Sequence, residues 1–285
     1  MFRMPLGAFT QDESFPFYIH FGEHEDAVFL HGHDNYFELV IVMSGQAVHI
    51  VDGERYRIEK GDVFVIGPDT EHGYEAPENF HICNVMFRAR FLDLQSYDIA
   101  QTPGFQALFV LEPQRSRSAH FTSHLKLSAT EFRRIADMLH RLCDEYYGRE
   151  AGWKTMVRAD FLRLAVTLSR LYDTDKIGTG AGIVKLAPAL AYIETHYQEE
   201  LSVAALAAMS HYSDRQFIRL FREATGCLPL QYITRLRMQH AQELLRTTDL
   251  SVSEVAACCG YPDSSYFSRL FRRLYGITPR RYRQM

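Results

Sequence analysis

Three histidines and one glutamate in the N-terminal third of the chain have side chains that could bind a ligand or a metal ion. His31-x-His33-x4-Glu38 is followed, after several apolar runs, by His72. Imidazole nitrogens and carboxylate oxygens are donors for divalent ions such as Zn, Ni, Fe or Mn. The same groups also suit a pocket for an organic ligand, or plain hydrogen bonding at a polar rim. The residue types leave these three alternatives open.

Arginines form a second chemically informative group, because they recur near the C-terminus at a fixed distance. A set of eight residues is repeated 50 positions later: Phe217, Arg219, Leu220, Phe221, Arg222, Gly226, Pro229 and Tyr232 return as Phe267, Arg269, Leu270, Phe271, Arg272, Gly276, Pro279 and Tyr282. A repeat of this period is a supersecondary unit used twice. Arginine suits bidentate contacts with phosphate and guanine.

The charge is distributed unevenly along the chain. From Ile183 to the end there are 13 basic and 9 acidic residues, a net charge of +4, and 12 of the 13 are arginine. The remaining residues carry 18 basic and 26 acidic side chains, a net charge of −8. This asymmetry indicates that the C-terminal part contacts nucleic acid.

Each copy of the repeat predicts a short helix, a tight turn and a second helix. This is the layout of a helix-turn-helix unit, whose second helix enters the DNA major groove. We expect units at about 201–223 and 250–274, joined by a helix from Tyr232 to Leu245. Ser213-x-x-Gln216 and Ser251-x-x-Glu254 have the spacing of capping boxes. Two units on one chain predict contacts with two neighbouring major-groove segments.

The buried residues of each second helix determine which side faces outward. Phenylalanine and leucine at i, i+3 and i+4 are expected to face the core. The outward side then carries Arg215, Ile218, Arg219 and Arg222 in the first unit, and Ser264, Ser265, Ser268, Arg269 and Arg272 in the second. Because these outward residues differ between the copies, the DNA site is expected to be asymmetric.

The N-terminal part reads as a small antiparallel β-structure. Residues 15–88 contain short apolar or alternating runs that predict consecutive strands, separated by Ser-Gly, Asp-Gly and Lys-Gly-Asp turns. The runs are FELVIVMSG, QAVHIVDGE, RYRIEKGD and VFVIGPDTEH. Short strands this close together are typical of a sandwich or barrel. The whole chain is therefore expected to be α+β, with a sensing domain over 1–127.

Helical segments and a linker follow. Ser128-x-x-Glu131 is a capping box and predicts the start of a helix, whose apolar residues follow at helical spacing: Phe132, Ile135, Ala136, Leu139 and Leu142. A second helix is expected from about Trp153 to Tyr172. Its apolar side carries Met156, Phe161, Leu164, Leu168 and Leu171. These stripes suit either covering the barrel or contacting a second subunit, and we favour a homodimer through 128–172. The glycine-rich segment 173–182 predicts a flexible linker to a DNA-binding domain over 183–285.

The C-terminal stretch resembles the AraC/XylS family of bacterial transcription regulators. Arg237–Leu245 (RxxxAxxLL) and Ser251–Arg283 carry the resemblance. It implies RNA polymerase as a partner and, by position, base contacts from Arg215, Ile218, Arg219, Ser264, Ser265, Ser268 and Arg269. The sequence departs from the family at His211, which stands where glycine is common at a turn that needs a positive φ.

The N-terminal part resembles the cupin superfamily. His31-x-His33-x4-Glu38-x6-Gly45 is similar to its first motif, and Gly61-Asp62 through Pro68 to His72 to its second. This implies a β-barrel with a ligand cavity. The barrel segment also resembles sensor domains of rhamnose-operon activators, which implies a sugar or related polar effector. Side chains suited to such a ligand are Tyr18, His20, His31, His33, Tyr36, Glu38, His49, His72 and Tyr74.

The overall prediction is a ligand-responsive DNA-binding transcription regulator, an activator of carbohydrate-utilisation genes. No apolar run is long enough for a membrane span, no signal core is present and the five cysteines are scattered, so we expect a cytoplasmic protein. We expect neither an enzyme nor a required cofactor. The alternative is a metal-dependent cupin enzyme, an isomerase or dioxygenase using His31, His33, Glu38 and His72. It leaves the C-terminal repeat unexplained.

Overall fold

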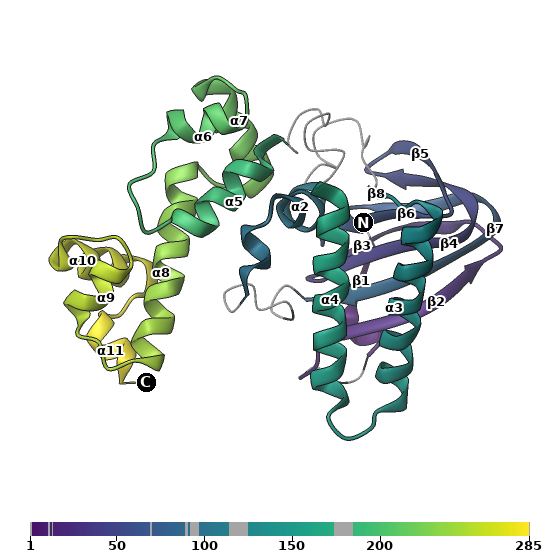
Figure 1. Ribbon diagram of the computed structural model, residues 1–285, viewed down its shortest axis with the longest axis horizontal. Coiled ribbons are helices and arrows are strands. Elements are labelled where there is room, and N and C mark those ends of the chain that lie inside the picture. Colours follow the sequence, from purple (N-terminus) through teal and green to yellow (C-terminus); the bar gives the residue numbers. More distant parts are fainter. Residues whose placement is uncertain are drawn as a thin grey trace. The chain divides into compact units, whose positions relative to one another are not determined.

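The chain forms a strand-rich unit followed by a helical unit, which confirms the α+β prediction (Figure 1). The computed structural model describes residues 2–10, 12, 14–68, 70–88, 91, 97–113, 125–173 and 185–284. The two compact units are Met1–Lys185 and Leu186–Met285. Residues 174–182 of the predicted linker lie outside the described residues.

Two long antiparallel strands, β4 and β7, form the centre of the first unit. β2 and β3 pair with β7, while β5 and β6 pair with β4; β1 and β8 extend the sheet at β3 and β6. The strands are β1 (Arg3–Pro5), β2 (Phe17–His24), β3 (Val28–Asp34), β4 (Phe37–Val51), β5 (Glu54–Glu59), β6 (Asp62–Ile66), β7 (His72–Phe87) and β8 (Leu125–Lys126).

The predicted Ser-Gly turn at Ser44-Gly45 is wrong, because β4 continues through it. Gly45 has φ +70, and the β4–β7 register shifts on both sides of Ser44. A Cβ atom at Gly45 would lie 2.2 Å from the Asn79 carbonyl oxygen. Glycine therefore makes a bulge here rather than a hairpin. The predicted Asp52-Gly53 turn is confirmed: both residues have positive φ and join β4 to β5 as a two-residue hairpin.

The sheet rolls up on itself. Phe64 pairs with Val40, and His49 lies nine residues further along β4, a separation of about 30 Å in a straight strand. The rings of His49 and Phe64 are nevertheless 4.6 Å apart. This folding encloses an apolar core made of Val40, Val42, Ala47, Ile58, Phe64, Ile66, Tyr74, Phe80 and Ile82.

Two long helices, α3 (Ala129–Gly148) and α4 (Trp153–Asp173), cover the outer side of this sheet (Figure 1). The capping box at Ser128 is confirmed. The Phe161 ring lies 4.8 Å from that of Phe87 and 5.4 Å from that of Phe17. Met156 was expected on the apolar side but is 50% exposed, because the buried stripe runs through its neighbour Val157 instead. Short helical segments are η1 (Leu6–Ala8), η3 (Asp98–Gln101), α2 (Pro103–Phe105) and η4 (Gln106–Leu111).

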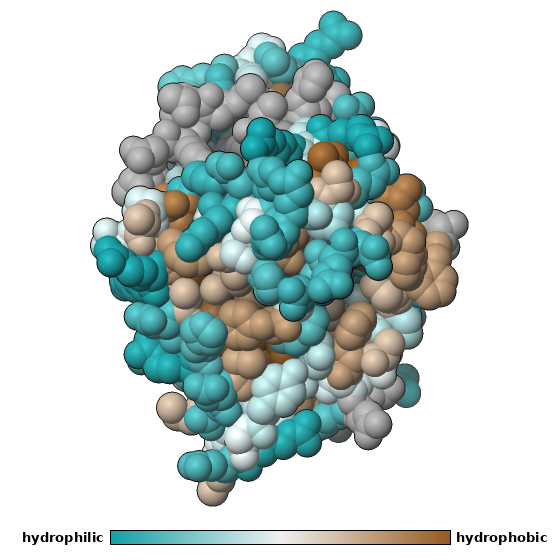
Figure 2. All heavy atoms as spheres, turned by 90° about the vertical axis from the view of Figure 1, so that its right-hand side faces the viewer, coloured by the Kyte–Doolittle hydropathy of each residue, from teal (hydrophilic) through white to brown (hydrophobic). Residues whose placement is uncertain are grey.

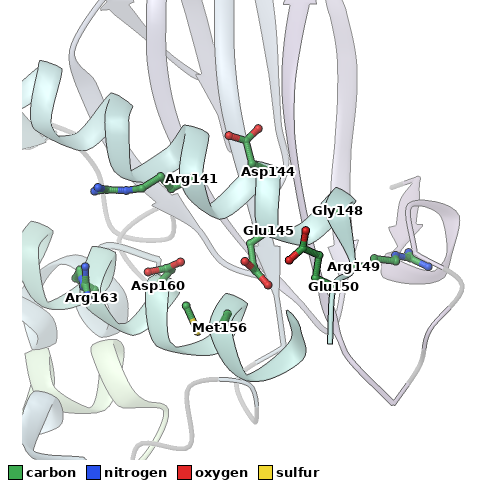
Figure 3. Close-up of a pocket in the computed structure, with 9 residues that line it drawn as sticks. All are labelled: Arg141, Asp144, Glu145, Gly148, Arg149, Glu150, Met156, Asp160 and Arg163. Atoms are coloured by element: carbon green, nitrogen blue, oxygen red, sulfur yellow. The ribbon is translucent and has the colours of Figure 1, made fainter. Parts of the chain in front are cut away.

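The outward side of α3 and α4 is highly charged. Arg141 and Glu145 from α3, and Asp160 and Arg163 from α4, line a groove to which Met156 of α4 also contributes (Figure 3). On the side of the molecule seen in Figure 2, polar side chains surround apolar patches. Among the described residues, no helix is long and apolar enough to cross a membrane.

The second unit consists of seven helices in its described part. They are α5 (Ala187–His196), α6 (Val203–Met209), α7 (Asp214–Thr225), α8 (Pro229–Thr247), α9 (Val252–Cys258), α10 (Ser264–Tyr275) and α11 (Pro279–Arg283). The start of α8 packs on α7, with the Tyr232 and Phe221 rings 5.6 Å apart. Met238 and Leu245, later in α8, belong to the core around α9 and α10. The helix α8 thus packs against two helix pairs, α6 with α7 and α9 with α10, and is shared by both.

Candidate functional site

The turns inside the two helix pairs have the same backbone geometry. His211 has φ +55 and Gly260 has φ +78, so His211 adopts the predicted conformation. The next amide closes each turn in the same way: Tyr212 donates to the Ala207 carbonyl and Tyr261 to the Ala256 carbonyl. Equivalent residues of the two turns, such as His211 and Gly260, are 49 positions apart, whereas equivalent residues of α7 and α10, such as Phe217 and Phe267, are 50 positions apart. The second turn therefore contains one additional residue before the helix that follows it. We call α7 and α10, the second helices of the two pairs, the reading helices.

Side-chain caps set where the reading helices begin. Ser213 accepts a hydrogen bond from the Gln216 amide at the start of α7. At α10 the cap is Asp263, whose carboxylate accepts from the Tyr266 and Ser265 amides at 3.1 and 2.8 Å. These backbone hydrogen bonds lower the pKa of Asp263. An ionised carboxylate at this helix start is also favoured by the helix dipole.

All nine residues predicted to face DNA lie on the outward sides of α7 and α10. Six are exposed, and Ile218, Ser264 and Ser268 are half-buried. Behind them, Phe217 and Phe267 are completely buried, which orients the outward face. Guanidinium and hydroxyl groups presented in this way can contact base edges and phosphates.

One contact on this face is not predictable from the repeat. Arg219 Nη1 lies 2.8 Å from Glu223 Oε1, and both side chains are partly exposed. In the second copy of the repeat, the residue at the position equivalent to Glu223 is Arg273. The first reading helix therefore carries an internal ion pair where the second carries an extra positive charge. The i, i+4 spacing of Arg219 and Glu223 was the available sequence signal.

Inside the rolled sheet, the structure brings together the four predicted metal-ligand candidates. Glu38 Oε2 lies 3.1 Å from His33 Nε2 and 3.3 Å from His72 Nε2. The two imidazole nitrogens are 3.0 Å apart. With His31, all four side chains are buried and their ligand atoms lie within 4.8 Å of one another. The pairing of His31 with His72 joins β3 to β7, and the roll of β4 brings Glu38 to them.

The charges of this cluster suit a cation or a hydroxyl-bearing molecule. Burial disfavours ionisation of Glu38, but hydrogen bonds from His33 and His72 outweigh it and hold the pKa of its carboxyl well below its usual range. Burial lowers the pKa of His31 and of His72. The imidazole Nδ1 of His31 lies 3.0 Å from the Phe29 carbonyl; donation there leaves Nε2 as an acceptor. Three imidazoles and a carboxylate form a complete donor set for a divalent metal.

The other predicted ligand residues surround this cluster. Tyr36 stacks on His33 at 4.4 Å, His49 Nε2 lies 3.4 Å from His72 Nδ1, and Tyr74 lies 5.0 Å from the His49 ring. Tyr18 and His20 are half-buried on β2, and their rings are 5.6 Å apart.

Two polar residues of this interior were missed from the sequence. They are His24 on β2 and the buried Asn84 on β7. Within the described part of the chain, several buried polar atoms have no hydrogen-bond partner: His20 Nδ1, His24 Nε2, Tyr36 Oη, Tyr74 Oη and Asn84 Oδ1. The alternation of Tyr18, His20 and His24 along β2 was the signal that could have indicated His24.

Comparisons with known proteins match a domain family to each unit of the chain. Residues 206–285 match a family model described as a helix-turn-helix domain, and residues 16–153 match one described as an AraC-like ligand binding domain. The chain is 32% identical to the HTH-type transcriptional activator RhaS of Escherichia fergusonii, over 99% of this chain and 90% of that protein. It is 31% identical to RhaS of Enterobacter sp. strain 638, over 90% and 88%.

A solved structure, the DNA-binding domain of AdpA in complex with a target DNA, is 41% identical over 35% of this chain and 90% of that chain, with a TM-score of 0.34. The relatives that match nearly the whole chain are named transcriptional activators, so the alternative of a cupin enzyme finds no support among them. The similarity to these relatives extends through both units of the fold. The chain therefore belongs to the AraC family of helix-turn-helix transcriptional regulators.

Proposed function

We propose that this chain activates transcription by binding DNA through α7 and α10 in response to a small polar molecule bound inside the rolled sheet. The observation that carries the proposal is the pairing of two outward arginine faces with a polar interior in the other unit. Arg219 and Arg269 supply direct base contacts, and Arg222 and Arg272 supply contacts to phosphates or bases. The name of the RhaS relatives supports activation rather than repression.

The polar interior favours a sugar as the effector. Buried polar atoms without partners require a ligand or water to satisfy them, and Tyr74 and Asn84 supply such atoms. Glu38 is ionised, and burial lowers the pKa of its neighbour His72, which favours the neutral imidazole, so the site offers both acceptors and donors to hydroxyl groups. The controlled genes would then serve carbohydrate use.

Selection of duplexes from a random pool by the full-length chain tests DNA binding. We expect a recurrent sequence with two conserved blocks, whose affinity falls steeply with salt. A panel of neutral sugars and sugar acids is then tested for thermal stabilisation of the full chain and for changed transcription from the selected sequence. Binding without sequence preference would contradict the proposal.

A divalent metal at His31, His33, Glu38 and His72 is a second candidate role, favoured by the convergence of their ligand atoms. Bound there, the metal would polarise ligand hydroxyl groups or simply stabilise the fold. Elemental analysis of the purified chain, followed by Zn²⁺ titration of the wild type and of Glu38→Gln, tests it. One ion per chain that is lost in the variant would support the metal; no binding by the wild type would exclude it.

The remaining partners are also proposals. The apolar sides of α3 and α4 pack inside the first unit, so a homodimer would use their charged outer groove, where Arg141 and Arg163 can meet Glu145 and Asp160 of a second copy. Light scattering of the full chain at low and high salt tests this. We further propose that the protein contacts RNA polymerase at its promoters and acts in the cytoplasm.

A further inference from the structure

We propose that Arg237 sets the spacing between the two reading helices, α7 and α10, and is a positioning residue for DNA recognition. The proposal goes beyond the proposed function but rests on DNA binding by both helices. Arg237 lies near the middle of α8, the helix that the two helix pairs share.

The guanidinium of Arg237 binds backbone carbonyls that belong to both halves of the unit. Nε donates to the Tyr197 carbonyl at 2.5 Å and Nη2 donates to the Glu199 carbonyl at 2.7 Å. Nη1 donates to the Gly260 carbonyl at 3.1 Å. Tyr197 and Glu199 follow α5 and precede the first helix pair, whereas Gly260 forms the turn of the second. One side chain therefore ties the two halves together.

An independent contact shows how closely the halves approach at this point. A Cβ atom at Gly260 would lie 2.2 Å from the Gln198 carbonyl oxygen. The second turn thus packs directly against the segment that follows α5. The ring of Tyr261, the next residue, lies 5.2 Å from the Arg237 guanidinium carbon, in cation–π contact. These contacts oppose rotation of the second helix pair about α8.

The separation and rotation of α7 and α10 decide which DNA spacing both can read. Inserting one base pair between two sites moves them apart by about 3.4 Å and rotates them by about 34°. If the Arg237 contacts hold α7 and α10 rigidly, the protein cannot adapt to such a change in spacing, whereas a variant with weaker contacts can. Lysine has the charge of arginine but not its planar fork of donors, so it cannot reproduce three carbonyl contacts at these angles.

The test uses the full-length chain and a duplex selected by the wild type from a random pool, with one or two base pairs inserted between its two conserved blocks. The wild type should prefer the original spacing by about thirtyfold, the middle of the range expected for the loss of one base contact. Arg237→Lys and Arg237→Met should each reduce that preference about tenfold. Unfolded protein lowers binding to every duplex equally, so the ratio is insensitive to lost stability.

Arg235→Met is the matched control, because the Arg235 guanidinium packs 4.8 Å over Tyr232, within the first half. It should retain the wild-type preference. Arg237 variants that retain it as well, even with reduced thermal stability or reduced affinity, would overturn the spacing role. Recovery of no common sequence in the selection would overturn the proposed function itself, and the spacing role with it.

Discussion

Replacing the two equivalent arginines should reveal an asymmetry between the reading helices. A well-placed arginine–guanine contact is worth about 1–3 kcal/mol, or roughly 5- to 150-fold in affinity. Arg269→Ala should lose this full amount at one base position. Arg219 must share or give up its contact with Glu223 when it binds DNA. An exposed i, i+4 pair contributes about 0.3–0.5 kcal/mol, so Arg219→Ala should lose about twofold less than Arg269→Ala.

Removing the Glu223 carboxylate tests the role of the same ion pair through its other partner. Glu223→Gln frees Arg219 and removes a negative charge that repels phosphate. We expect about twofold tighter binding to the selected sequence and a larger gain on unrelated DNA, so specificity falls. The dependence of log affinity on log salt should steepen by up to about 0.9, equivalent to one additional phosphate contact.

Fluorescence anisotropy with the selected duplex and with single-base variants, between 50 and 200 mM salt (roughly the range over which phosphate contacts are resolved), measures these effects. Each arginine variant should lose its preference at one position only. Equal weakening on every sequence would show that Arg219 and Arg269 contact phosphates alone. A Glu223→Gln variant with reduced affinity would show instead that the ion pair orders Arg219 for binding.

Three further predictions concern stability. Burial lowers the pKa of His20, His24, His31 and His72 below 6.5, so the unfolded chain binds more protons than the folded chain as the pH falls. The melting temperature of the first unit, followed in metal-free buffer, should therefore drop between about pH 7.5 and 5.5. A melting temperature that does not change over this range would contradict the prediction. Gly45→Ala forces a Cβ atom against the Asn79 carbonyl and should cost about 1–3 kcal/mol in urea denaturation, whereas Gly53→Ala, at a φ of +87 but with open space around it, should cost less. Phe267→Ala removes a completely buried ring and should cost about 3–5 kcal/mol with loss of DNA binding; Tyr266→Ala, at a half-exposed neighbour, is the control, and equal losses would argue against the described core.

Much of the second unit was predictable because its signals are local. Helical spacing of Phe217 and Phe267 identifies the buried side of each reading helix, and Ser251 with Glu254 marks a helix start. Both kinds of signal act within one or two helical turns. The Arg219–Glu223 pair also lies within one turn, but the repeat does not indicate it, because the residue equivalent to Glu223 in the second copy is Arg273.

The first unit shows where local signals stop. Ser44-Gly45 resembles a turn in sequence, and only the approach of the Asn79 carbonyl decides that Gly45 makes a bulge. The motif spacing of His31, His33, Glu38 and His72 pointed to one site, while His24 and Asn84 were missed. Whether a strand residue faces the interior depends on register, which is set by pairing between distant segments.

The sequence by itself determined that this chain has two arginine-bearing helix pairs and a strand-rich unit with four ligand-type side chains. Periodicity and residue type are sufficient for this, since they follow from contacts within a few residues. Only the tertiary structure decided that Glu38 meets His72, because the sheet must first roll up. It also decided that Arg237 joins Tyr197 to Gly260. Such contacts join residues far apart in the chain, and their geometry depends on how whole elements pack.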